Sequence, residues 1–128
     1  MAIKILIIDD EPMIIKILSH LLSLDDYKII SAVDGVEGIE KFDAENPDFV
    51  LLDMKMPKMD GMETLKRLRR KSQTVPIVIM TGNNDKEIED ESFWNGSSAY
   101  VEKPFAYDKV KKMIEFLLTP ITTAHGGY

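Results

Sequence analysis

The chain has 128 residues, enough for one compact domain and too few for a second of ordinary size. Its 16 basic and 22 acidic residues give a net charge of −6, which disfavours direct binding to nucleic acid or to an anionic membrane surface. It contains no cysteine, which excludes disulfides, thiolate metal sites and cysteine nucleophiles. Because no apolar run is long enough to cross a membrane, the sequence predicts a soluble cytoplasmic protein.

Short apolar runs alternate with longer amphipathic segments along the chain. The runs are rich in β-branched residues and nearly uninterrupted, as expected of strands buried on both faces of a parallel sheet. We expect strands at residues 3–8, 27–32, 49–52, 77–80 and 99–101. Strand and helix alternating five times predict an α/β fold, a doubly wound parallel sheet with helices on both faces.

The segments between the runs carry apolar residues at helical spacing. We expect helices at residues 11–22, 34–45, 60–71, 84–95 and 108–118. The spacing places Ile17, Val36 and Phe93 on the inner faces of the first, second and fourth helix, and the fourth has the weakest pattern. The basic cluster at residues 66–71 predicts a solvated helix end. We expect one domain over residues 1–119 and a flexible tail or linker stub over 120–128.

Polar side chains follow four of the predicted strands at their carboxyl ends, where ligands bind in sheets of this kind. They are Asp9 and Asp10, Asp53, Thr81 and Lys103. Three neighbouring carboxylates repel one another unless a hard cation lies among them, so the set predicts a Mg²⁺ site. A nearby ammonium and hydroxyl suit a phosphoryl group, and one carboxylate could be its nucleophile.

Four motifs follow one another at these strand ends. They are Ile7–Pro12 (IIDDEP), Leu51–Gly61 (LLDMKMPKMDG), Met80–Gly82 (MTG) and Tyr100–Phe105 (YVEKPF). Together they resemble the receiver domain of two-component response regulators, over residues 3–118. The resemblance implies a flavodoxin-like sheet of strand order 2-1-3-4-5 with five helices. It also implies a Mg²⁺-dependent switch that takes a phosphoryl group from a sensor histidine kinase or phosphotransfer protein, and that is not otherwise an enzyme.

Matched residue by residue, the resemblance makes Asp53 the phosphoacceptor. The Mg²⁺ ligands that it implies are oxygen atoms, those of Asp9, Asp10, Asp53 and the backbone carbonyl of Lys55. Thr81 and Lys103 would contact the phosphoryl oxygens.

The resemblance also implies a conformational switch. Tyr100 occupies the position of the switch aromatic and would turn inward as Thr81 moves toward the phosphoryl group. The Lys103–Pro104 peptide bond is expected to be cis. A downstream protein would then bind the face formed by the last two helices and the strand between them, residues 84–118.

Three positions depart from the usual pattern of the family. Lys55, two residues after the acceptor, could screen the phosphoryl group or obstruct the attacking water, so we hypothesise an altered rate of self-dephosphorylation. Gly82 replaces the usual Ala and would loosen the loop after Thr81. Ala106 replaces an Asp that commonly caps the last helix, so we expect that helix to start without a side-chain cap.

Several alternatives stay open at this point. The chain is either a stand-alone receiver or the receiver part of a larger regulator. An aspartyl-phosphate hydrolase is disfavoured because Lys55 stands where such an enzyme has a second acid. A flavin-binding module is disfavoured because no Gly/Ser/Thr-rich loop follows the first strand. Trp94 is either a core-facing ring or an exposed anchor for a partner.

Overall fold

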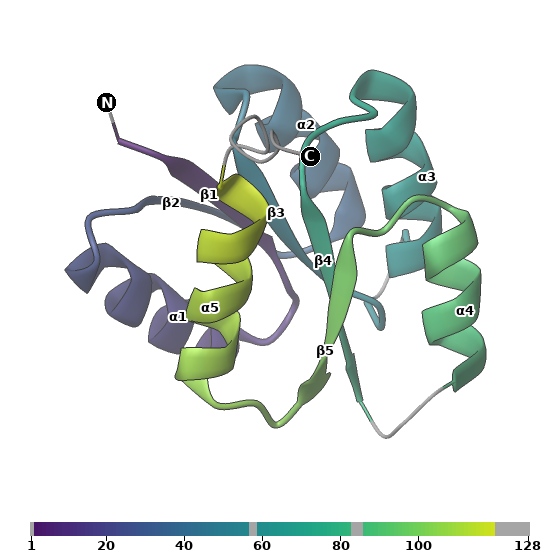
Figure 1. Ribbon diagram of the computed structural model, residues 1–128. Helices are drawn as coiled ribbons and strands as arrows, with labels where there is room; N and C mark the ends of the chain where they lie inside the picture. Colours follow the sequence, from purple (N-terminus) through teal and green to yellow (C-terminus); the bar gives the residue numbers. More distant parts are fainter. Residues whose placement is uncertain (1, 57–58, 83–85, 120–128) are drawn as a thin grey trace, which may run out of the picture.

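A computed structural model describes residues 2–56, 59–82 and 86–119 (Figure 1). Its five strands are β1 (Lys4–Ile8), β2 (Lys28–Ala32), β3 (Phe49–Asp53), β4 (Ile77–Gly82) and β5 (Ala99–Lys103). They form one sheet of order β2-β1-β3-β4-β5, and every neighbouring pair is parallel. The predicted doubly wound sheet and its strand order 2-1-3-4-5 are therefore confirmed.

Five helices connect and follow the strands. They are α1 (Pro12–Leu24), α2 (Gly35–Glu45), α3 (Gly61–Lys71), α4 (Lys86–Trp94) and α5 (Tyr107–Leu118). Asp34 and Asp60 cap α2 and α3, since each carboxylate accepts a hydrogen bond from the backbone N–H three residues later. The predicted tail at 120–128 and the predicted start of the fourth helix at 84–85 lie outside the described residues.

Side chains alternate between two cores, one on each face of the sheet. Ile5 and Ile7 point to the core that α1 and α5 cover, whereas Leu6 and Ile8 point to the core that α2 and α3 cover. Figure 1 shows α4 beside α3, next to the β4–β5 edge of the sheet. Within the described ranges, no helix is long and apolar enough to cross a membrane.

The structure contradicts the predicted inward position of three residues and the predicted solvation of one residue in the basic cluster. Ile17, Val36 and Phe93 are exposed, because helical spacing shows which residues share a stripe but not how much of that stripe the sheet covers. In the basic cluster, Arg69 is not simply solvated. Its guanidinium is half-buried and donates hydrogen bonds to three backbone carbonyls of the adjoining loops.

Candidate functional site

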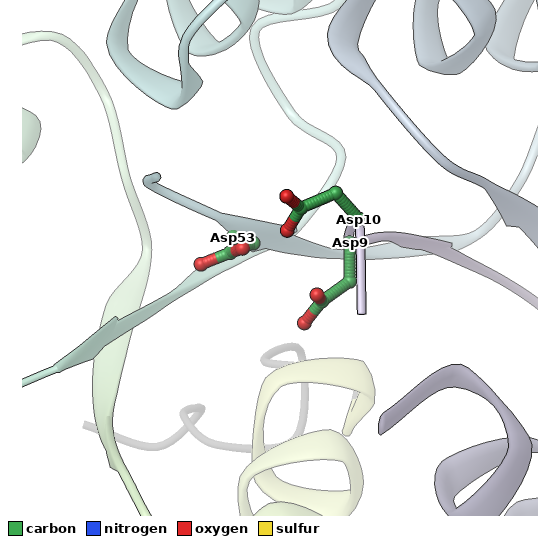
Figure 2. A group of neighbouring side chains, drawn as sticks. All are labelled: Asp9, Asp10 and Asp53. Atoms are coloured by element: carbon green, nitrogen blue, oxygen red, sulfur yellow. The ribbon is translucent and has the colours of Figure 1, made fainter. Parts of the chain in front are cut away.

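Three carboxylates meet at the carboxyl ends of β1 and β3. Asp9 and Asp10 follow β1, and Asp53 ends β3, its neighbour in the sheet. One carboxylate oxygen of each lies within 4.8 Å of the others, and Figure 2 shows the three side chains gathered at this edge. Asp9 and Asp53 are buried, whereas Asp10 is exposed at the rim. The arrangement provides three oxygen ligands, one of them at the solvent-exposed rim, which is a donor set that suits Mg²⁺.

The ammonium of Lys103 joins this cluster from the end of β5. Its Nζ lies 2.9 Å from Oδ2 of Asp9 and 3.4 Å from Oδ1 of Asp53. A third contact, 3.0 Å to Oε1 of Glu11, holds the ammonium from the solvent side. Burial lowers the pKa of Lys103, but hydrogen bonds to Asp9 and Glu11 outweigh it and raise the pKa overall. Lys103 therefore stays charged. The peptide bond between Lys103 and Pro104 is cis, as predicted.

The ionised form of Asp53 is disfavoured in the folded chain. Burial raises its pKa to about 6, and the negative charge of Asp9 adds to the effect. The charge of Lys103 and a hydrogen bond from the backbone N–H of Lys55, at 3.4 Å, act in the opposite direction. At neutral pH the carboxylate is mostly ionised but only weakly stabilised, so a cation or an electrophile at its oxygen lowers its free energy.

Thr81 contributes a buried hydroxyl to the same edge. Its side chain is 3% exposed, and within the described part of the chain its Oγ1 has no hydrogen-bond partner. Buried hydroxyls are nearly always hydrogen-bonded, since an unmade bond costs about 1–3 kcal/mol. The hydroxyl is thus available to a ligand that brings its own acceptor oxygen.

Three other predicted residues lie around these groups. Tyr100 is exposed on β5, and the negative charge of Glu89 of α4 raises the pKa of its hydroxyl. The Lys55 side chain is exposed next to the acceptor, and its carbonyl as a metal ligand stays a prediction. At Gly82 an added Cβ would meet no atom of the described residues within 4 Å.

Two contributors were missed by the sequence reasoning. Glu11 pairs with Lys103, and its backbone N–H donates to Oδ1 of Asp9 at 2.9 Å. The sequence did contain a signal for this role, because Glu11 is the third consecutive acid after β1. Gly61 is the other: a Cβ there would lie 2.5 Å from the carbonyl oxygen of Asp53, so the start of α3 can approach the acceptor only with glycine.

Comparisons with known proteins identify the family of the chain. A family model described as the response regulator receiver domain matches residues 5–115. The alkaline phosphatase synthesis transcriptional regulatory protein PhoP of Bacillus subtilis (strain 168) is 34% identical over 115 residues, which cover 90% of this chain and 48% of that protein. Sporulation initiation phosphotransferase F of the same organism is 34% identical over 112 residues, covering 88% and 90%.

A solved structure agrees with these relatives. The chemotaxis protein CheY4 of Vibrio cholerae superposes with a TM-score of 0.88 at 29% identity, covering 92% of this chain and 100% of that one. The chain belongs to the receiver domain family of two-component response regulators. It spans about half the length of several curated relatives that it matches.

Proposed function

We propose that Asp53 accepts a phosphoryl group from a phosphohistidine of a sensor kinase or phosphotransfer protein. The observation that carries this proposal is the convergence on Asp53 of two further carboxylates and the Lys103 ammonium. In the transfer, an Asp53 oxygen forms a bond to phosphorus while the P–N bond breaks, and its electron pair stays on the histidine ring. The product is an acyl phosphate on Asp53.

The surrounding residues would hold the charges of this reaction. Asp9, Asp10, Asp53 and the carbonyl of Lys55 would bind Mg²⁺, which supplies neutralisation of the phosphoryl charge. Lys103 would keep its ammonium near Asp53 and exchange a carboxylate contact for a phosphoryl oxygen. The Thr81 hydroxyl, which lacks a partner among the described residues, would donate to another phosphoryl oxygen.

The movement of Thr81 would carry the signal to the surface. As its hydroxyl turns toward the phosphoryl group, Tyr100 would leave its exposed position beside Glu89 and turn inward. Tyr100 lies on β5 between α4 and α5, so this step would remodel the face that those three elements form. We assign that face to the downstream protein partner.

The same proposal limits the chemistry of the chain to gaining and losing one phosphoryl group. A phosphate-ester hydrolase of the aspartyl-phosphate type would need a general acid near the acceptor, and Lys55 offers a cation in its place. A cytoplasmic location, where a kinase would meet this domain, belongs to the proposal as well. Both a stand-alone receiver and the receiver of a longer regulator are consistent with it, since relatives of both lengths match.

The experiment is to incubate the chain with acetyl phosphate and to follow its intact mass. We expect a mass increase of one phosphoryl group that needs Mg²⁺ and is abolished by chelation. Asp53→Asn should show no increase, whereas Asp43→Asn, a matched change on α2 away from the site, should behave like the parent. An unchanged parent mass, or the same increase in Asp53→Asn, would overturn the proposal.

A further inference from the structure

A second surface lies between the C-terminal ends of α3 and α4. Each of these helices begins near the carboxyl end of the preceding strand and runs back across the sheet (Figure 1). The C-terminal ends of α3 and α4 therefore lie near the amino ends of the strands, whereas Asp53 lies at a carboxyl end. An open groove of about 580 Å³ separates them. Its lining combines cations, amides and one indole, from Lys66, Arg69, Arg70, Gln73, Trp94 and Asn95. No carboxylate of the described residues lines it, although the chain as a whole carries a net charge of −6.

The cations of this groove are not neutralised within the described part of the chain. The guanidinium of Arg69 donates to the carbonyls of Gly96 and Val75, both at 2.7 Å, and neither partner is charged. Lys66 and Arg70 form no ion pair with a described residue; Glu63, the acid on their helix, is paired with Arg67 and attracts these two cations only at longer range. The groove therefore offers positive charge to an anionic ligand.

The indole of Trp94 stands beside these cations and is 82% exposed. It packs edge-on against the exposed ring of Phe93, with centroids 5.7 Å apart. Two large rings outside the core form an apolar surface that a soluble domain normally buries in a contact. Tryptophan is also the residue type most enriched among those that dominate binding energy at protein interfaces.

The shape and charge of the surface favour one kind of ligand. A small molecule needs enclosure on most sides, whereas the exposed Trp94 leaves this groove open. A nucleic acid is a long polyanion that would extend beyond the groove and over the acids Glu87 and Glu91 of α4, which do not line it, whereas a short peptide can stay on the cations. A short acidic peptide segment with an apolar side chain fits both parts of the surface, with carboxylates on the cations and the apolar group on the indole.

We propose that this groove is a docking site for an acidic segment of a partner protein, anchored by an aromatic or aliphatic side chain on Trp94 and by carboxylates on Lys66 and Arg70. The site is at the opposite edge of the sheet from the phosphoacceptor. It can be occupied while a phosphodonor engages Asp53, and it does not depend on the proposed phosphotransfer.

The test uses a short synthetic peptide of alternating Glu and Asp around a central Leu-Phe pair, titrated against the whole chain. Trp94 is the only tryptophan, so its emission reports binding directly. We expect a saturable change that weakens with salt. We expect the affinity to fall by about tenfold or more in Trp94→Ala and in the double variant Lys66→Glu/Arg70→Glu. Because Trp94→Ala has no tryptophan, its binding is measured by the fluorescence polarisation of a labelled peptide.

Matched variants separate this groove from general surface effects. Phe116→Ala removes another exposed ring, 78% exposed on α5, and Lys109→Glu/Lys112→Glu makes the same charge change beside it. We expect both to bind the peptide like the parent. No saturable binding, equal binding by the groove variants, or equal binding of a Lys-rich peptide would overturn the proposal. A concentration-dependent dimer that Trp94→Ala dissociates would assign the groove to a second copy and overturn it too.

Discussion

At the scale of single residues, Asp53 links the chemistry of the site to the stability of the fold. Its pKa in the folded chain, about 6, lies above the ordinary value of 3.8. The folded state therefore binds this proton more tightly than the unfolded state does. The stabilisation that the protonated group provides is complete below about pH 4 and is lost as the pH rises through about 6.

This linkage predicts that Asp53→Asn stabilises the metal-free protein at neutral pH. We expect the free energy of unfolding to rise by about 1–3 kcal/mol at about pH 7.5, since one pKa unit corresponds to about 1.4 kcal/mol. Urea denaturation with chelator present measures the difference, which should shrink toward about pH 4. Parallel stability profiles for the two proteins across this pH range would contradict the raised pKa.

Lys55 allows a second prediction at this scale. Its side chain is exposed and follows Asp53 by two residues, so its ammonium is expected to lie near an acyl phosphate at the acceptor. We expect Lys55→Asn to change the lifetime of the phosphorylated state, because an ammonium either screens the phosphoryl charge or obstructs the water. The lifetime is measured by the decay of the phosphorylated mass after removal of acetyl phosphate. Lys16→Asn on α1 is the control, and equal lifetimes in parent and Lys55→Asn would remove the idea.

At the scale of the secondary-structure elements, α5 starts without a side-chain cap. Ala106 has the extended backbone of an N-cap, with φ −83° and ψ 140°, but no group to accept a hydrogen bond. We expect Ala106→Asp and Ala106→Asn to raise the free energy of unfolding by about 0.5–2 kcal/mol each. Denaturant titration measures this gain. A gain with Asp but none with Asn would show that charge rather than capping is responsible.

A second prediction concerns the contact between α1 and α5. The hydroxyl of Tyr107 lies 2.8 Å from Oδ2 of Asp25 and 3.2 Å from the carbonyl oxygen of Leu21, at the end of α1. We expect Tyr107→Phe to lower the free energy of unfolding by about 1–2 kcal/mol, because the hydrogen bond to a charged group is lost while the ring still packs. Lys111→Met removes a more exposed partner of Asp25 and should lower the free energy of unfolding less than Tyr107→Phe does. Equal losses in both variants would contradict this account of the contact.

The helices and strands were predictable from the sequence because their apolar residues follow clear patterns, a helical spacing in the helices and short continuous runs in the strands. The buried strands show nearly continuous β-branched runs, and Asp34 and Asp60 mark two helix starts with a side chain that caps them. The contacts that side chains make with residues far along the chain were not predictable. Glu11 and Arg69 find partners far along the chain, in Lys103 and in the loop after α4, and no local pattern encodes such contacts.

At the scale of the whole molecule, the two proposed sites lie at opposite ends of the strands, with the Asp53 site at the carboxyl ends and the groove between α3 and α4 at the other. The carboxyl ends of β1, β3, β4 and β5 bring together the residues that the strand-end reasoning selected, because parallel strands place those ends at one edge. The exposed position of Trp94 at the other edge could not be settled from the sequence, since a ring near a helix end fits a core or a surface equally well. The fold thus separates phosphoryl chemistry from the groove between α3 and α4.

We propose that a charge event at Asp53 changes the conformation of β4, β5 and the face beside them. The most direct measurement is the change in backbone amide chemical shifts when beryllofluoride, a mimic of the phosphoryl group, is added with Mg²⁺. We predict saturable shifts at Thr81, Tyr100 and Lys103 that spread into α4 and are absent in Asp53→Asn. Shifts confined to Asp9, Asp10 and Asp53, or shifts that persist in Asp53→Asn, would contradict the account.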